Sequence, residues 1–155
     1  MEDDRQSAGS VIRVSAVVLR DDAGQVLTVR KRGTERFMLP GGKHEPGETP
    51  VEAAVRECSE ELRIELDATM LRQLGTFRAP AANEKGFTVD AVVFEAATTL
   101  EVVDPAAEID AARWLDPRHP LPLDLAPLLA EHVIPALRQY DASADRAPAS
   151  SSPSC

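Results

Sequence analysis

Residues 49–63 constrain the fold of this chain more than any other segment, because they predict where a helix begins and which of its faces is buried. Thr49 is a suitable N-cap, Pro50 suits the first helical position, and Glu52 follows the cap by three residues, as in a capping box. We therefore expect a helix that starts at Pro50 and runs to about Arg63.

The expected helix has an acidic face beside an apolar one. At about 100° per residue and with Glu57 as zero, Glu60 falls near 300° and Glu61 near 40°. The apolar side chains occupy the adjoining arc: Ala54, Val55, Cys58 and Leu62. Carboxylates at this spacing repel one another, and Mg²⁺ or Mn²⁺ would relieve the repulsion because both ions take carboxylate oxygens. A solvated acidic face is the alternative on a chain of net charge −9.

Further residues flank this face at fixed spacing. Gly42 is followed by Glu48 and then by Arg56, Glu57, Glu60 and Glu61, in the sequence GKHEPGETPVEAAVRECSEELRI. The segment resembles the Nudix box, G-x5-E-x7-R-E-U-x-E-E-x-G-U with U a bulky apolar residue, and all six positions match. An accidental match has a probability on the order of 10⁻⁷ per window. The chain is therefore similar to Nudix hydrolases, and to MutT-like members in particular.

Two positions depart from the box. Cys58 stands where a larger aliphatic residue is usual, a mild change for a small buried hydrophobe. Arg63 replaces the glycine that would close the helix in a left-handed conformation. Either Arg63 keeps that conformation, at a cost on the order of 1 kcal/mol relative to glycine, or the helix ends differently. We expect this local cost without loss of catalysis.

The resemblance implies an α/β fold, an α/β/α sandwich around a central mixed β-sheet, with the box as a catalytic loop-helix-loop. The order of the expected elements agrees with it. They are strands at 11–20 and 25–31 joined by a hairpin turn, strands at 74–79 and 87–97 around a loop, a short strand at 109–115, and a second helix over 121–140. Between the hairpin and the first helix, the chain is expected to stay loop-like through Gly47 from the Pro40-Gly41-Gly42 turn.

The resemblance also implies roles for the box residues. Glu57, Glu60 and Glu61, together with Gly42, are the expected metal-site residues. Either Glu57 or Glu61 is the expected general base, and the sequence does not choose between them.

Other residues take supporting roles by the same resemblance. Arg56 and Glu48 would form the ion pair that orients the helix. Glu108, six positions before Trp114, stands where MutT-type members carry a further catalytic or metal-linked carboxylate. An ordinary loop glutamate is the alternative for Glu108.

An acidic chain needs local cations to bind phosphate. Lys43 matches the PGGK of MutT-like sequences, and Arg30 and Arg32 are the nearest other candidates, with surface charge as their alternative. Asn83, in the loop at 80–86, is a candidate for contacts with a base or sugar, or else a turn residue.

The implied reaction is attack of water on a phosphorus of a nucleoside diphosphate that is linked to another group, with Mg²⁺ as cofactor. The MutT resemblance indicates a nucleoside triphosphate, cleaved to a monophosphate and pyrophosphate. However, residues 121–127 (LPLDLAP) do not clearly provide the asparagine that reads damaged guanine in that subgroup. ADP-ribose, a nucleotide sugar or a dinucleoside polyphosphate remains an alternative substrate. A sensor without turnover is a third hypothesis, which the intact box disfavours.

Composition limits the remaining possibilities. The chain has 155 residues, 43% of them hydrophobic, which predicts one domain over 10–140 between a flexible N-terminus (1–9) and a disordered C-terminal tail (141–155). The net charge of −9 disfavours a nucleic-acid polymer as partner, and no apolar run reaches the length of a membrane span. The two cysteines predict a reducing, cytoplasmic location. A homodimer is compatible with the family, but no apolar patch predicts one.

Overall fold

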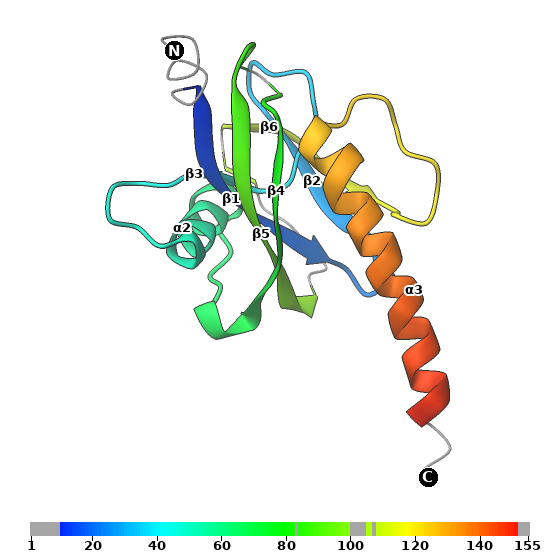
Figure 1. Cartoon of the computed structure of the whole chain (residues 1–155). Helices are drawn as coiled ribbons and strands as arrows, with labels where there is room; N and C mark the ends of the chain where they lie inside the picture. Colours follow the sequence, from blue (N-terminus) through cyan, green and yellow to red (C-terminus); the bar gives the residue numbers. More distant parts are fainter. Residues whose placement is uncertain (1–9, 83, 100–104, 107, 152–155) are drawn as a thin grey trace, which may run out of the picture.

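The computed structural model describes residues 10–82, 84–99, 105–106 and 108–151, and within them one mixed sheet forms the centre of the molecule (Figure 1). Its strand order is β4-β5-β1-β2-β6, with β3 paired to β1 off this path. The strands are β1 (Val11–Arg20), β2 (Val26–Lys31), β3 (Gly41–Lys43), β4 (Leu71–Pro80), β5 (Thr88–Thr99) and β6 (Ile109–Leu115). The β1–β5 pair is parallel and the other pairs are antiparallel, so the predicted mixed sheet is confirmed.

Helices cover both faces of the sheet. Helix α2 (Pro50–Leu62) lies on one face, and the π-helical segment η2 (Leu128–Val133) and helix α3 (Ile134–Ser151) lie on the other (Figure 1). A short 3-10 turn, η1 (Ala68–Met70), precedes β4. Alternate residues of β1 enter the two cores: Val17 packs with Cys58 of α2, and Val18 packs with Leu129 of η2. The predicted α/β/α sandwich is therefore confirmed. No helix within the described ranges is long and apolar enough to cross a membrane.

The predicted start of the first helix is confirmed in detail. The Thr49 side chain accepts a hydrogen bond from Glu52 N, and the Glu52 carboxylate accepts one from Thr49 N. Pro50 is the first helical residue. Both groups of the capping box are thus satisfied locally, which explains why sequence alone located this end of α2.

Several segments differ from the prediction. Residues 41–43, expected to be loop, form β3 and pair with β1 from Val14 to Ala16. The second helix begins at Leu128 and not at residue 121, because prolines at 120, 122 and 127 disfavour helix there. The preceding residues instead bond to Phe37, whose N–H donates to Asp124 O and whose carbonyl accepts from Ala126 N.

The turn before α3 is a π-helix and not an α-helix. Ile134 N donates to Leu129 O, five residues back, and Pro135 follows immediately. A proline ring clashes with the carbonyl four residues earlier in an α-helix, and a wider turn relieves this contact. The prolines therefore delay and distort this helix without ending it.

Helix α3 also continues past residue 140, where the sequence predicts the tail to begin. Asp141 accepts two hydrogen bonds from the guanidinium of Arg20 on β1, each 3.2 Å long. The helical backbone then runs to Ser151 through an alanine-rich stretch, and alanine has the strongest helix propensity. Residues 1–9 and 152–155 lie outside the described residues.

Arg63 closes α2 in the left-handed conformation that glycine usually takes. Its φ and ψ are 57° and 35°, and it is the single positive-φ residue other than glycine in the described part of the chain. Its N–H donates to Ser59 O over 3.0 Å. The helix therefore ends as the box pattern requires, although the side chain there has a Cβ.

We expect Arg63→Gly to raise the free energy of unfolding by about 1 kcal/mol, because glycine adopts this conformation without the Cβ contact. Thermal melting should show an increase of roughly 2–4 °C for a domain of this size. The control is Arg63→Ala, which also loses the hydrogen bond from Arg63 Nη1 to Pro105 O but keeps the Cβ. A glycine variant no more stable than the alanine variant would contradict the argument.

Candidate active site

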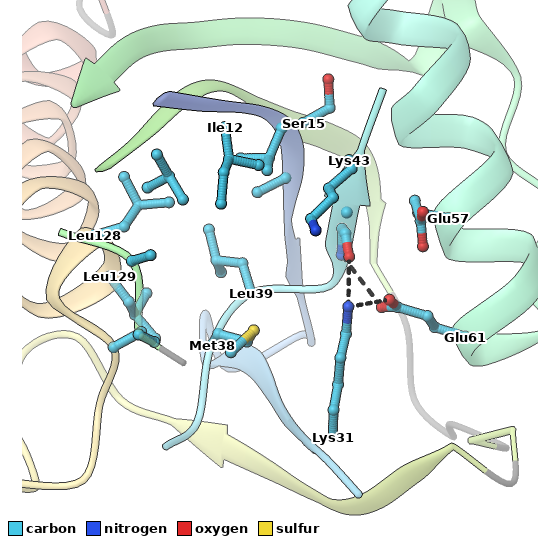
Figure 2. A pocket seen from close by; sticks show the side chains of 18 of the residues that line it. Ile12, Ser15, Lys31, Met38, Leu39, Lys43, Glu57, Glu61, Leu128 and Leu129 are labelled. Carbon is cyan, nitrogen blue, oxygen red and sulfur yellow. Dashed lines mark hydrogen bonds and ion pairs between the residues drawn. The ribbon is translucent and has the colours of Figure 1, made fainter. Parts of the chain in front are cut away.

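A pocket of about 420 Å³ lies between α2 and the start of η2, and one of its walls is the strand pair β1–β3 (Figure 2). This volume is in the range of small-molecule sites. Figure 2 shows two different sides: Lys31, Lys43, Glu57 and Glu61 gather on one, and Leu128 and Leu129 lie on the other. The pocket therefore presents charged groups and aliphatic groups to the same ligand.

Glu61 is the most deeply buried charged group in this pocket. Its side chain is 1% exposed, although it belongs to the face that the sequence predicts to be acidic. Its Oε1 accepts a hydrogen bond from Gly41 N over 3.2 Å, and its Oε2 lies 2.9 Å from Lys31 Nζ. Burial raises the pKa of Glu61 to about 7, against the opposing effect of Lys31, and the nearby Glu57 adds to the rise. A carboxylate in this position needs a positive charge beside it.

Two consecutive glycines allow β3 to lie between β1 and α2. A Cβ on Gly41 would lie 2.1 Å from the backbone oxygen of Ser15, and the φ of Gly41 is 154°. A Cβ on Gly42 would lie 2.4 Å from Glu57 Oε2. Glycine is therefore required at Gly41 because the backbone of β1 lies too close for a Cβ, and at Gly42 because the Glu57 carboxylate does.

Arg56 connects the loop before α2 to the acidic face. Its guanidinium donates to both carboxylate oxygens of Glu48, over 2.7 and 2.9 Å, and to Glu57 Oε2 over 2.9 Å. It also donates to Lys43 O over 3.0 Å and to Glu60 Oε1 over 3.3 Å. The expected Arg56–Glu48 ion pair is present, and it holds β3 and the loop against the helix.

The same contacts lower the pKa of Glu48 to about 2, through the Arg56 guanidinium first and the backbone N–H of Glu45 second. A carboxyl group whose folded pKa is depressed stabilises the folded state above its unfolded pKa, near 4.5. This contribution is lost as the pH falls from about 4.5 through about 2.

We therefore expect Glu48→Gln to flatten the acid side of the stability curve. Urea unfolding in EDTA should show that the difference between wild type and variant shrinks as the pH is lowered across that window. Glu45→Gln serves as control, because the Glu45 carboxylate is exposed and 3.7 Å from Arg56 Nε. A difference between wild type and Glu48→Gln that stays constant with pH would remove Glu48 as the cause.

The three box glutamates differ in their surroundings. The exposed fractions of their side chains are 14% for Glu57, 55% for Glu60 and 1% for Glu61. Glu57 and Glu60 both accept hydrogen bonds from Arg56 Nη1. Of the apolar arc predicted beside them, Ala54, Cys58 and Leu62 are buried and Val55 is partly buried. The helix therefore presents its carboxylates at three depths, from solvent to core.

These carboxylates fit a hard divalent cation that brings other ligands with it. Among the residues that the structure describes, no three His, Cys, Asp or Glu side chains converge closely enough to form a complete metal cage. Mg²⁺ seldom uses such a cage, because it keeps several waters and binds one or two carboxylates together with substrate phosphates. Glu57 and Glu61 line the pocket and provide carboxylate oxygens of the kind that Mg²⁺ binds.

The remaining predicted residues are distributed unevenly around the pocket. Lys43 lines it, with Nζ 3.3 Å from Glu84 Oε2, and Glu108 lines it as well. Arg32 is not among the described residues that line the pocket. The backbone N–H of Arg32 donates to Glu108 O. Asn83 lies outside the described residues.

Arg30 is not among the described residues that line the pocket. Its neighbour Lys31, which was not predicted as a site residue, lines the pocket. The Arg30 guanidinium pairs with Asp110 over 2.8 Å and lies 5.3 Å from the centroid of the Phe37 ring. The pairing of β2 with β6 shifts register between Arg30 and Lys31, as at a β-bulge, and such irregularities redirect side chains. Period-two alternation along β2 was the available signal that these neighbours face opposite ways.

His44 lies against β1, the central strand of the sheet. Its Nε2 is 2.7 Å from Ser15 Oγ, and this hydroxyl donates to Pro50 O over 2.8 Å. Ser15 is fully buried. The two bonds tie the loop before α2 to β1, so they hold the first turn of the helix close to the pocket.

Comparison with known proteins adds independent findings. The family model for the NUDIX domain matches residues 10–137. A putative 8-oxo-dGTP diphosphatase of Bacillus subtilis is 28% identical over 111 residues, which cover 72% of this chain and 70% of that protein. A Nudix hydrolase of Deinococcus radiodurans is 31% identical over 115 residues, 70% of this chain and 65% of that one. The chain thus spans about two thirds of the length of these relatives.

A solved structure gives the same result for the fold. A MutT NUDIX hydrolase from Burkholderia pseudomallei superposes with a TM-score of 0.65 and 25% sequence identity. The superposition covers 83% of this chain and 97% of that one. The range matched by the family model, residues 10–137, contains the elements that line the pocket.

Proposed function

Since the chain belongs to the Nudix family, whose members hydrolyse acid anhydrides in phosphorus-containing compounds, we propose that it cleaves a nucleoside triphosphate to a monophosphate and pyrophosphate with Mg²⁺. The substrate proposal extends the MutT-like resemblance of the sequence, and the relative from Bacillus subtilis carries a name of the same kind. Mn²⁺ is expected to substitute for Mg²⁺, because both ions accept carboxylate, phosphate and water oxygens.

The observation that carries this proposal is the two-sided pocket. Its charged side brings Glu57 and Glu61 together with the ammonium groups of Lys31 and Lys43. Its aliphatic side includes Leu128 and Leu129, and a nucleobase has flat apolar faces that such side chains can cover. A triphosphate joined to a base matches both sides in one molecule.

The charged side has the groups that hydrolysis of a phosphoanhydride requires. When bound, a divalent cation makes a coordinated water more acidic and neutralises charge on phosphate oxygens. Glu57 and Glu61 are the proposed ligands, with Glu60 and Gly42 at the same site, and Glu108 also lines the pocket. Lys43, exposed on β3, is proposed to contact a phosphate oxygen.

The proton of the attacking water needs an acceptor on the same face. We assign this role to Glu61, because its carboxylate lines the pocket and is held in place by the Gly41 N–H. Glu57 is the alternative, since it lies one turn earlier on α2 and lines the same pocket. Arg56 positions Glu57 through its bond to Oε2 and is itself held by Glu48.

A nucleotide panel tests the reaction and the substrate together. Full-length protein with Mg²⁺ is incubated with the nucleoside triphosphates, 8-oxo-dGTP, ADP-ribose, a nucleotide sugar and a dinucleoside polyphosphate. Phosphorus NMR then separates pyrophosphate from orthophosphate among the products. We expect pyrophosphate and a nucleoside monophosphate from a triphosphate, and loss of both products in EDTA.

Glu60→Gln and Glu61→Gln are the controls in the same panel. Turnover that survives both substitutions would exclude these carboxylates from the mechanism. Faster cleavage of ADP-ribose, a nucleotide sugar or a dinucleoside polyphosphate would replace the triphosphate as substrate while leaving the reaction class intact. Absence of turnover on every compound would support the third hypothesis, a sensor that binds a nucleotide without turnover.

A further inference from the structure

Lys31 lies at the end of β2 and places its ammonium group against the most deeply buried carboxylate of the pocket. Its Nζ is 2.9 Å from Glu61 Oε2 and donates to Gly41 O over 3.1 Å (Figure 2). The Lys31 side chain is 31% exposed, in contrast to that of Glu61. The ion pair thus joins a carboxylate fixed in the core to a cation on a flexible stem that borders open space.

The ammonium group contacts the Glu61 oxygen that does not bond to the backbone of β3. Oε1 of Glu61 accepts the Gly41 N–H, and Oε2 lies against the Lys31 ammonium group. Two cations at the same carboxylate oxygen repel each other strongly where water is scarce. A divalent ion that binds Oε2 is therefore expected to compete with Lys31 for that oxygen.

Removal of Lys31 without replacement would leave Glu61 in an unfavourable state. An ionised carboxylate buried without a partner is strongly destabilising, and its other charged neighbour in the pocket, Glu57, has the same sign. In the metal-free protein, the ion pair with Lys31 reduces the destabilisation that the buried charge of Glu61 causes. In the metal-bound protein, a divalent cation can provide the same compensating charge.

We propose that Lys31 is a place-holding counter-ion for Glu61, which keeps this carboxylate charged and oriented until a divalent cation displaces the ammonium group. The inference rests on the proposed function, because it takes the metal site at Glu61 from that proposal. Lys31 is thus a positioning residue that competes with the metal for one oxygen. Its effect on metal affinity should be opposite to that of a residue that helps to bind the metal.

Lys43 provides a matched control within the same pocket. It also contributes one positive charge to the wall, but its Nζ pairs with Glu84 on the loop after β4 and its side chain is 64% exposed. Loss of Lys43 changes the charge of the pocket by the same amount without releasing Glu61. A comparison of the two lysines therefore separates competition between Lys31 and the metal at Glu61 from the effect of removing one positive charge from the pocket.

The test measures Mn²⁺ binding to the full chain without substrate, by the EPR signal of free Mn²⁺ at pH 8. We expect Lys31→Met to lower the dissociation constant about tenfold, the smaller end of the range for residues that act through a metal ligand. Lys31→Arg keeps the charge and should bind Mn²⁺ like the wild type. Lys43→Met should change the constant by about twofold at most, as an exposed charge does.

Thermal unfolding gives a second readout on the same proteins. In EDTA, Lys31→Met should melt below the wild type, because Glu61 loses its counter-ion. Saturating Mn²⁺ should raise its melting temperature by more than that of the wild type, since tighter binding to the folded state stabilises it further. Where Lys31→Met does not fold in EDTA, Lys31→Gln, which keeps a donor without the charge, takes its place in both measurements.

Three results would overturn the inference. Weaker Mn²⁺ binding by Lys31→Met would show that Lys31 helps to form the metal site. Equal tightening by Lys31→Met and Lys43→Met would assign the effect to the net charge of the pocket. Absence of Mn²⁺ binding in the wild type and every variant would remove the metal site itself, and would contradict the proposed function as well as the inference.

Discussion

Glu61→Gln is expected to reduce turnover by about 1,000-fold or more while the protein remains folded. A metal site lowers the barrier by several kcal/mol, and each 1.4 kcal/mol corresponds to a tenfold change in rate. Glutamine keeps the shape of the side chain and an oxygen that can accept the Gly41 N–H. It removes the negative charge that both the proposed metal site and the proposed base require.

Steady-state kinetics with saturating Mg²⁺, on whichever substrate the panel identifies, measures this effect. Glu52→Gln is the matched control, because Glu52 lies on the same helix and glutamine preserves the capping box. The control should stay within about twofold of the wild type, and circular dichroism should show both variants folded. A Glu61→Gln rate within tenfold of the wild type would exclude Glu61 from the chemistry.

Gly41→Ala should be the most damaging single substitution for stability in β3, with a loss of roughly 3 kcal/mol, the upper end of the usual range for overpacking. The added Cβ would lie 2.1 Å from Ser15 O and 2.8 Å from Ala16 Cα. Both are backbone atoms of β1, the strand at the centre of the sheet, and neither can move without disturbing its neighbours. Urea unfolding of the metal-free protein measures the loss.

Gly42→Ala is the comparison that separates stability from catalysis. Its Cβ would meet the carboxylate of Glu57, the far end of a flexible side chain, so the fold should lose less than with Gly41→Ala. The carboxylate should move, however, and turnover should fall by about tenfold or more, as when a residue that orients a metal ligand is lost. Equal stability of the two alanine variants would contradict the packing of β3 described above.

The parts of the fold that sequence predicted well are those whose causes are local. The start of α2 depends on three residues within one turn, Thr49, Pro50 and Glu52, and the structure confirms each. For the end of α2 the sequence left two outcomes open, a left-handed Arg63 or a different helix end, and the structure shows the first. The acidic and apolar faces of α2 follow from helical periodicity alone.

The parts that sequence missed depend on partners far along the chain. Strand β3 has only three residues and two are glycines, so nothing local predicts a strand, and its pairing is provided by β1. Alternation along β2 indicates that Arg30 and Lys31 face opposite ways, but the sequence of β2 does not say which of them faces the pocket. Helix α3 extends to Ser151, and the contact of Asp141 with Arg20 spans most of the chain.

The candidate site shows the same division. The box spacing located four residues of the site: Glu48, Arg56, Glu57 and Glu61. Arg56 donates hydrogen bonds to Glu48 and Glu57, and Glu57 and Glu61 line one pocket. It did not reveal that Glu61 is buried while Glu60 is mostly exposed, because depth depends on how β3 and β2 pack against α2. Spacing along a helix therefore predicts which side chains share a face, and packing decides what each can do there.

The parallel pairing of β1 with β5 also determines when the pocket can form during folding. Val14 at the start of the chain pairs with Ala91, and the pocket has walls from β1, α2 and η2. Contacts between residues so distant in sequence form late, because a long loop must close first. A chain emerging from the ribosome can form the hairpin of β1 and β2 early, but it completes the pocket only after residues near 129 have been synthesised. Hydrolytic activity should therefore appear in one step, with the closure of the second helical layer over the sheet.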